Sequence, residues 1–405
     1  MTKRILILST LDTKGAETAF LRRQIELRGC RTTVMDIGIL GQPAMQADVR
    51  REEVAKTAGW NLEQIRAFPT RKRMVDAMTK GATQKVKLLY SANHFDGIIG
   101  IGGGTGMHMG TAIMRALPIG LPKLMVSSMA SMDMSQFIGA KDITMMNSIA
   151  DLGSLNGVTK KILAQAAGAI CGMVEPDVHT RSTKPSVAVS AFGITTLCAE
   201  HIGRFLDTRG YEMVIFHTVG SGGMAMEELI SQGLFMGVLD LTTHEFIDQV
   251  AGGHYGNIGN ERLQTAGKKG IPQIVGPGGL DCIGIDQTGV IPHKFQGRRT
   301  YYHDFRSCVR SNAEELAVVA TILADKLNKA IGPVKFLVPS KGWSSASREG
   351  EALFDPEADQ AFMDTLRDCL QPQIEISELD VHIDDSEYAE TAVSLLDEMI
   401  QDRAR

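Results

Sequence analysis

The chain lacks the cysteine patterns of metal-binding and disulfide-rich proteins. Its 405 residues include six cysteines, and none of them stands in a C-x-x-C motif. Cysteines scattered in this way form neither a zinc knuckle nor a disulfide framework. We therefore expect a reducing, cytoplasmic compartment.

Long apolar runs and an excess of basic charge are also missing. The first apolar run covers only residues 5–8 and is followed at once by polar residues, which predicts a buried strand and not a secretory signal. The longest uncharged stretch, 97–114, holds seven glycines and does not predict a membrane span. The net charge of −5 argues against nucleic acid or a membrane surface as a partner.

Short apolar runs alternate with longer helical patterns through the first half of the chain. They predict strands at 4–8, 32–37, 97–101 and 123–127. Between the first two runs, the apolar face of a predicted helix consists of Ala16, Ala19, Phe20 and Leu27. Strand, helix and strand in this order indicate a parallel sheet with right-handed crossovers.

A polar break at 175–185 predicts a linker between two domains, residues 1–178 and residues 184–405. The second half begins as the first does, with Ser9 matched by Ser190 and Gly29 by Gly210. Duplication and shared fold constraints both explain this match. Helices at about 312–330, about 356–370 and from about 385, with a strand at 333–338, complete the second domain.

The predicted fold class is therefore α/β, with two Rossmann-like, doubly wound parallel-sheet domains and a ligand cleft between them. Ligands of open α/β sheets bind outside the carboxyl ends of the strands.

The first candidate site is the loop directly after strand 4–8. It contains Leu11, Asp12, Thr13 and Lys14, just before a helix. Backbone amides and Thr13 would face a phosphate, Lys14 would supply charge, and Asp12 would lie near a ribose or a metal. The alternative is an Asp/Thr helix cap with a solvated lysine.

The second candidate site is the glycine-rich loop after strand 97–101. It consists of Gly102, Gly103, Gly104, Thr105 and Gly106, and it matches neither G-x-G-x-x-G nor Walker A. So many glycines indicate that the backbone comes close to something. That partner is either a phosphate or a neighbouring strand on which the helix packs.

Two weaker candidates follow other strands. One is Gly220, Ser221, Gly222 and Gly223, which either contact a ligand or serve only the fold. The other is the set Ser127, Ser128 and Ser131, whose hydroxyls either donate to a ligand or stabilise a turn.

Other motifs indicate little catalytic chemistry. His244-Glu245 begins like a zinc-protease helix, but Asp248 stands where the second histidine is required. Four other histidines lie near glycine-rich turns and are candidate general bases, although a single histidine is more often structural: His217, His254, His293 and His303. The stretch 342–346 resembles a nucleophile elbow only loosely.

Several motifs together resemble one protein family. They are LDTKGAE, IGGGTG, PKLMVSSMAS, DITMMNSIADLGSLN, AGAICGMV, VGSGG, GIPQIVGPGGLD and DPEAD, and they run from residue 9 to about residue 359. This order is similar to the ATP-binding N-terminal region of the tomato mosaic virus resistance protein and its bacterial relatives. The resemblance implies two Rossmann-like subdomains, nucleotide in the cleft and a homodimer, but no established reaction.

The leading hypothesis is a cytoplasmic ATP-binding protein that holds phosphates with loops 10–15 and 102–106. ATP usually brings Mg²⁺ with it, held mostly by phosphate and water. One alternative is a catabolic enzyme for an acidic or acyl small-molecule substrate, and another is a regulatory module that senses ATP. No catalytic residue and no metal ligand can be assigned from the sequence.

Overall fold

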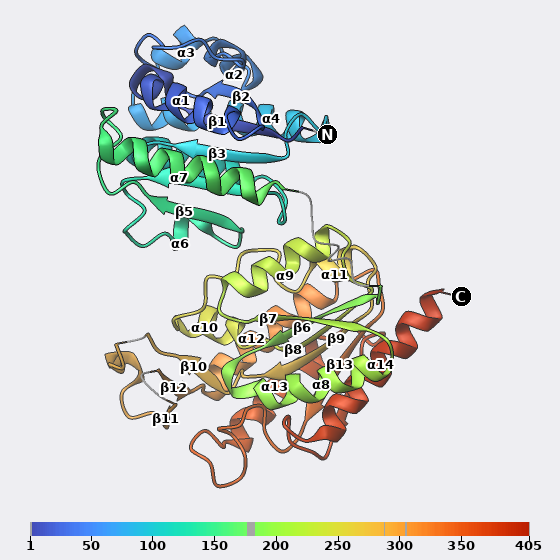
Figure 1. The fold of residues 1–405 in the computed structure, drawn as a ribbon. Coiled ribbons are helices and arrows are strands. Elements are labelled where there is room, and N and C mark those ends of the chain that lie inside the picture. The colour runs from blue at the N-terminus through green and yellow to red at the C-terminus, as the bar shows by residue number, and fades with distance from the viewer. Residues whose placement is uncertain (1, 176–182, 287, 304–305, 405) are drawn as a thin grey trace. The chain divides into compact units, whose positions relative to one another are not determined.

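The computed structural model describes residues 2–175, 183–286, 288–303 and 306–404, and the chain divides into two compact units, residues 1–180 and 181–405 (Figure 1). Most of the predicted linker, and the predicted domain end at residue 178, lie outside the described residues. Each unit is described separately below.

The first unit contains a five-stranded sheet in the order β2-β1-β3-β4-β5, with every neighbouring pair parallel. The predicted strands match the first four of these to within one residue. The elements are β1 (Arg4–Ser9), α1 (Leu11–Glu26), β2 (Arg31–Asp36), α2 (Arg51–Thr57), α3 (Leu62–Arg66), α4 (Arg71–Ser91), β3 (Gly97–Ile101), α5 (Gly104–Arg115), β4 (Lys123–Ser127), α6 (Ser135–Ile138), β5 (Ile143–Asn147) and α7 (Gly157–Met173).

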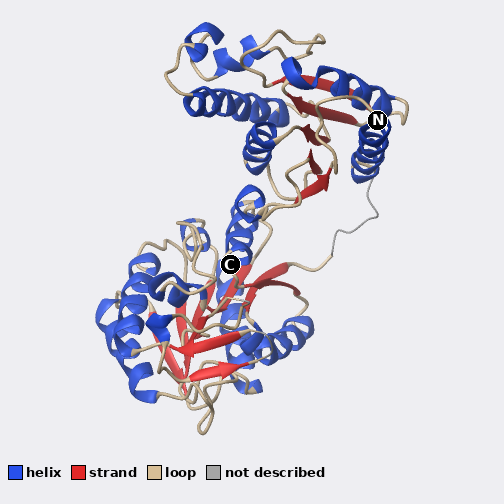
Figure 2. Cartoon of the chain, turned by 90° about the vertical axis from the view of Figure 1, so that its left-hand side faces the viewer, coloured by secondary structure: helices blue, strands red, loops and turns tan. Residues whose placement is uncertain are grey.

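Helices cover both faces of this sheet (Figure 2). Helices α1 and α7 pack on one face through a cluster that includes Ile7, Leu21 and Leu163, all fully buried. Helices α2, α4 and α5 pack on the other face through a second cluster, with Val54, Met78 and Ile113 fully buried. A parallel sheet covered on both faces needs apolar side chains in both directions, which is why its strands are nearly continuous apolar runs.

The predicted apolar face of α1 is wrong except at Phe20, which is partly buried against the core cluster. Leu27 is 69% exposed, and the alanines of the predicted stripe point to solvent. The buried stripe instead contains Leu11, Leu21 and Ile25. Leucine and isoleucine remove far more apolar surface from water than alanine does, so they determine which way the helix turns.

The second unit contains a six-stranded sheet in the order β14-β13-β9-β8-β6-β7, again with parallel neighbours. A small antiparallel sheet, β10-β12-β11, is inserted after β9 and was not predicted. The elements are β6 (Ser186–Ala191), η1 (Gly193–Thr195), α8 (Thr196–Thr208), β7 (Glu212–His217), α9 (Ser221–Ser231), β8 (Gly237–Thr242), α10 (Glu245–Ala251), α11 (Thr265–Lys268), β9 (Gln273–Gly278), β10 (Cys282–Gly284), η2 (His293–Phe295), β11 (Thr300–Tyr302), β12 (Ser307–Arg310), α12 (Ala313–Leu327), β13 (Val334–Pro339), α13 (Pro356–Cys369), β14 (Glu375–Leu379) and α14 (Ser386–Ala404).

The two sheets share one strand order. In the first unit the second strand lies outside the first, and the third, fourth and fifth follow on the other side. Reading the second unit's parallel strands in chain order gives the same arrangement, with β14 added at the far edge. The predicted α/β class with two doubly wound parallel sheets is thus confirmed, while a ligand cleft between the units stays a prediction.

None of the helices in the described part of the chain is both long and apolar enough to span a bilayer.

Candidate functional site

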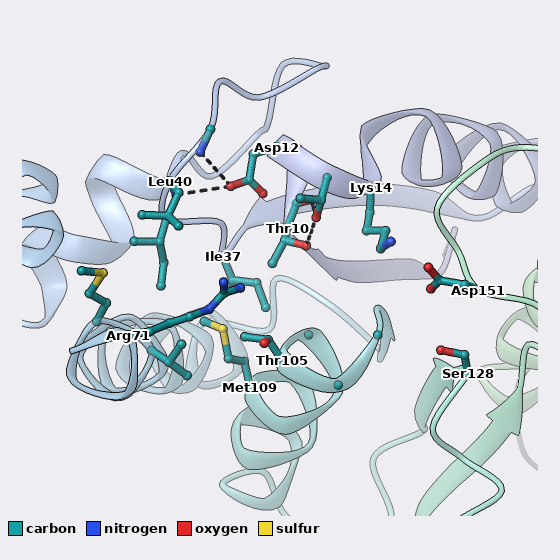
Figure 3. Close-up of a pocket in the computed structure, with 18 residues that line it drawn as sticks. Thr10, Asp12, Lys14, Ile37, Leu40, Arg71, Thr105, Met109, Ser128 and Asp151 are labelled. Atoms are coloured by element: carbon teal, nitrogen blue, oxygen red, sulfur yellow. Dashed lines mark hydrogen bonds between the residues drawn. The ribbon is translucent and has the colours of Figure 1, made fainter.

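The first unit has a pocket at the point where its strand order reverses. Chain connections leave β1 toward β2 on one side and toward β3 and β4 on the other, so the loops after β1 and β3 diverge there. The pocket has a volume of about 560 Å³, within the range of small-molecule sites (Figure 3). It is lined by Thr10, Asp12, Thr13, Lys14, Ile37, Ile39, Leu40, Gly41, Arg71, Met74, Val75, Gly103, Gly104, Thr105, Gly106, Met109, Ser128 and Asp151.

The start of α5 presents free backbone amides to this pocket. Gly103 is the residue before the helix, and as a glycine it has no side chain to cap the helix start. Its carbonyl oxygen accepts a hydrogen bond from the Met107 amide. No residue in the described segments accepts a hydrogen bond from the amides of Gly104, Thr105 or Gly106. Three unsatisfied amides at the positive end of a 12-residue helix form a site that favours an anion.

The glycines of this loop have different roles. A Cβ on Gly102 would lie 2.8 Å from the Cα of Gly106, so Gly102 is required for close packing inside the loop. A Cβ on Gly104 would meet no atom within 4 Å, and Gly104 is one of the residues that line the pocket. Neither residue has a positive φ. Of these two, Gly104 is therefore the glycine whose missing side chain leaves room for a ligand.

Two cations line the pocket. Lys14 lies at a kink in α1, where its backbone is non-helical, and its side chain extends toward Asp151 (Figure 3). Arg71 is the first residue of α4 and extends into the pocket from the other side. Within the described residues neither side chain makes an ion pair closer than 4.0 Å. Both charges are thus available to a ligand.

Asp12 accepts hydrogen bonds from the loop that follows β2. Its Oδ2 accepts hydrogen bonds from the amides of Leu40 at 3.3 Å and Gly41 at 3.1 Å, and it lies 3.9 Å from Nη1 of Arg51. The loop after β2 is thereby fixed beside the pocket. Asp151 differs, since its exposed carboxylate has no hydrogen-bond donor among the described residues.

One wall of the pocket is apolar, and the loop that forms part of it is held by a buried ion pair. Arg51 is 2% exposed, and its Nε donates to Asp36 at 2.6 Å. Its Nη1 donates to the Gly41 carbonyl at 2.7 Å, which ties the loop to α2. The wall itself consists of Ile37, Ile39, Leu40, Met74, Val75 and Met109.

The structure brings together only part of the predicted site. Lining the pocket are Asp12, Thr13, Lys14, Gly103, Gly104, Thr105, Gly106 and Ser128. The other four predicted residues of this unit do not line it: Leu11, Gly102, Ser127 and Ser131. Leu11 and Ser127 are buried, with the Leu11 amide bonded to Asp36 and the Ser127 hydroxyl accepting from Met129.

Arg71, Asp151 and the apolar wall were missed. Arg71 begins a basic run directly after Pro69-Thr70. A cation at the start of a helix was the sequence signal that could have indicated an anion site there. Asp151 lies in the stretch DITMMNSIADLGSLN, which was used only for the family resemblance. The wall residues come from the segment after β2, from α4 and from α5, and they meet only in the folded unit.

The third predicted loop belongs to the second unit. A carboxylate of that same unit already accepts a hydrogen bond from one of its amides. The amide of Gly220 donates to the buried carboxylate of Glu245 at 2.7 Å. A Cβ on Gly223 would lie within 2.7 Å of both Glu245 and Arg262, and one on Gly222 would collide with the His217 carbonyl. These contacts are those of a loop packed inside its own domain.

Arg262 links this loop to the sheet. Its guanidinium is fully buried and pairs with Asp240 and Glu245. Burial alone would lower the pKa of Arg262, but the surrounding carboxylates raise it well above its ordinary value. The arginine therefore stays charged, and the network fixes the start of α9 against β8.

The remaining motifs form no metal-binding cluster among the described residues, and the central serine of the 342–346 motif is buried. No cluster of three or more histidine, cysteine or acidic side chains in the described residues is suited to a metal ion. Ser344, in the loose nucleophile-elbow motif, is fully buried and its hydroxyl donates to Asp281. All six cysteines are free.

Comparison with known families covers nearly the whole chain. Residues 3–179 match the model described as "Uncharacterised protein family (UPF0261) N-terminal domain", and residues 184–400 match that of its C-terminal domain. The chain belongs to the UPF0261 family.

Individual relatives agree with this assignment. A UPF0261 protein of Clostridium tetani is 37% identical over 392 residues, which cover 96% of this chain and 97% of that protein. The ToMV resistance protein Tm-1(GCR237) of Solanum lycopersicum is 33% identical over 325 residues, 78% of this chain and 43% of the tomato protein. The family resemblance stated from the motifs is thus confirmed.

Among solved structures, a putative UDP-N-acetylglucosamine 2-epimerase from Listeria monocytogenes is 10% identical, with a TM-score of 0.22, over 68% of this chain and 79% of that one. At that score the likeness says nothing about function.

Proposed function

We propose that the first unit of this UPF0261 protein binds ATP in the pocket between the loops after β1 and β3. The observation that supports this most is the convergence of three free amides at the start of α5 with the side chains of Lys14 and Arg71. A polyphosphate is the kind of ligand that can accept hydrogen bonds from the amides and also pair with the two cations.

The rest of the pocket fits the other parts of a nucleotide. The apolar wall formed by the segment after β2, by α4 and by Met109 of α5 offers a surface on which a planar base would bury apolar area. Thr13 and Ser128 supply hydroxyls near the same opening. Asp151 is the carboxylate best placed to meet Mg²⁺ through its water shell, since it is exposed at the pocket, whereas the Asp12 side chain is buried and its Oδ2 accepts from the loop after β2.

Isothermal titration calorimetry of the full chain with ATP, ADP and AMP tests this proposal. Because the second and third phosphates reach the cations, we expect affinity to fall in the order ATP, ADP, AMP. A chain that binds none of them, or binds AMP as tightly as ATP, would contradict the phosphate assignment. Phosphate release during the same titrations distinguishes an ATP-hydrolysing enzyme from a module that only senses the nucleotide.

Two companion proposals remain, and only the first comes from the family resemblance. One is a homodimer, which sedimentation equilibrium of the full chain tests. The other is the alternative of a catabolic enzyme that acts on a small-molecule substrate of acidic or acyl character.

A further inference from the structure

The loop after β5 contains a backbone outlier beside the pocket of the first unit. Ile149 has φ +62°, and its side chain is 72% exposed. A positive φ is rare for a residue with a Cβ and rarest for a β-branched one, because the Cβ crowds the neighbouring carbonyl oxygen. Residues in such conformations collect at functional sites, where the surrounding structure enforces them.

Hydrogen bonds enforce the conformation of Ile149. The amide of Ala150 donates to the Ser148 carbonyl oxygen at 2.6 Å, which closes a three-residue turn centred on Ile149. With a positive φ at its centre, this is the strained form of the γ-turn. The Ile149 amide donates to Oδ1 of Asn147 at 2.9 Å. The amide of the fully buried Ser148 donates to the Ser127 carbonyl oxygen at 3.2 Å, which ties the turn to the end of β4.

The turn determines where Asp151 lies. Asp151 comes two residues after Ile149 and directly before Leu152, which is fully buried in the core of the first unit. Between a fixed turn and a fixed side chain, its backbone has little freedom. Oδ1 of Asp151 lies 4.0 Å from the position that a Cβ on Gly103 would occupy. The carboxylate is therefore held near the start of α5, on the side of the pocket where Lys14 lies (Figure 3).

A carboxylate at this place conflicts with a bound phosphate unless a cation lies between them. The free amides at the start of α5 favour an anion, and Asp151 puts a second negative charge beside them. Two like charges side by side repel each other, whereas a divalent cation between them attracts both. The position of Asp151 therefore favours a nucleotide that arrives with its metal ion.

We propose that Ile149 is a positioning residue, and that its turn holds Asp151 where the carboxylate selects the Mg²⁺ complex of the nucleotide over free ATP. This inference rests on the proposed function, because the cation comes with ATP. Asp151 accepts hydrogen bonds from the water shell of the cation and repels phosphate that carries none. The strained turn keeps the carboxylate from swinging away into solvent.

Calorimetry of the full chain with ATP, in Mg²⁺ and in EDTA, tests Asp151 by the sign of the effect. In Mg²⁺ we expect Asp151→Asn to bind ATP about tenfold more weakly than wild type, because a charge-assisted contact is lost. In EDTA the same variant should bind more tightly than wild type, because the repulsion is gone. Asp133→Asn, exposed in the same unit but outside the pocket lining, is the matched control and should change neither affinity. A change of the same sign in both buffers, or none in either, would overturn the selection of the metal complex.

Two substitutions of Ile149 test the turn. Ile149→Pro cannot form it, because proline fixes φ at about −65° and has no amide to donate, whereas Ile149→Asn keeps it, because asparagine tolerates a positive φ. In Mg²⁺ we expect about tenfold weaker ATP binding by Ile149→Pro and wild-type affinity in Ile149→Asn. Val158→Pro is the matched control, since Val158 is exposed and also donates its amide to an asparagine side chain, but lies in the first turn of α7, where proline is tolerated. Equal affinities of the two Ile149 variants would remove Ile149 from the site.

The double variant Ile149→Pro/Asp151→Asn shows whether the turn acts through the carboxylate. A positioning residue has no effect once the group that it positions is gone, so the double variant should bind ATP as Asp151→Asn does, in Mg²⁺ and in EDTA. A further loss of affinity in the double variant would show that the turn serves packing alone. A wild-type chain that binds no ATP in either buffer would contradict the proposed function itself, whereas ATP binding that Mg²⁺ does not affect in any variant would contradict only this inference.

Discussion

Replacing Gly104 by valine should abolish nucleotide binding without unfolding the protein. A Cβ at this position meets no atom within 4 Å, and the residue has no positive φ, so the folded chain accommodates a side chain there. The same side chain would fill the space in front of the amides of Gly104, Thr105 and Gly106. The substitution should therefore lower the affinity for the nucleotide and leave the stability of the fold unchanged.

The magnitude follows from the contacts that the side chain displaces. A hydrogen bond to a charged group contributes about 1.5–3 kcal/mol, so loss of two phosphate–amide contacts costs about 3–6 kcal/mol. Affinity for ATP should therefore fall by more than about 100-fold. The free energy of unfolding should change by no more than about 0.5 kcal/mol, as for other exposed substitutions.

Calorimetry with ATP and urea unfolding, made on the same purified variant, measure both quantities. Gly102→Ala is the matched control within the same loop, because its Cβ would lie 2.8 Å from the Gly106 Cα. Such overpacking should cost about 1–3 kcal/mol of stability. If Gly104→Val were instead destabilised and still bound ATP normally, the glycine would serve helix packing and the phosphate-loop reasoning would be refuted.

Three further substitutions test other parts of the structure. Lys14→Ala should weaken ATP binding by about 1–3 kcal/mol with an unchanged melting temperature, whereas the exposed Lys160→Ala should change neither; equal affinities would make Lys14 a solvated side chain. Arg51→Met should lower the free energy of unfolding by about 3–5 kcal/mol, because it leaves buried carboxylates unpaired, and wild-type urea stability in this variant would show that the ion pair contributes nothing net. Burial raises the pKa of Asp248 to about 7, so the folded chain holds a proton there that the unfolded chain releases near pH 4. Wild-type stability should therefore fall relative to Asp248→Asn as the pH rises from about 4 to about 7, by up to about 4 kcal/mol, and parallel urea curves at every pH would assign the slope to other groups.

The strands were predictable where local chemistry alone determines them. Residues 97–101 and 123–127 are short apolar runs bounded by glycine, proline or polar residues, and they form β3 and β4 with the predicted bounds. The face of α1 was not predictable in the same way, because apolar residues lie on both sides of the helix, and the fold buries Leu21 and Ile25 while it leaves Leu27 exposed. The antiparallel β10-β12-β11 sheet consists of strands of three or four residues, too short for a periodic signal.

The candidate site was predicted where it lies in single loops and missed where it needs the folded unit. Lys14 and Gly104 each lie within the first turn of the helix that follows a strand, and strand ends mark ligand sites in this fold class. Arg71 enters the pocket only because α4 packs beside α5. The loop at Gly220 has the same glycine-rich composition as the loop at Gly104, but Glu245, 25 residues further on, occupies its amide. Composition alone does not reveal that internal partner.

Hydrogen–deuterium exchange of the full chain, with and without ATP, tests the central claim most directly, because it reads the amides themselves. The account predicts that ATP slows exchange in a peptide covering residues 102–109, where the amides of Gly104, Thr105 and Gly106 have no partner among the described residues. Exchange around Gly220, whose amide is already bound to Glu245, should not change. Protection around Gly220 with none at residues 102–109 would contradict the assignment of the phosphate site.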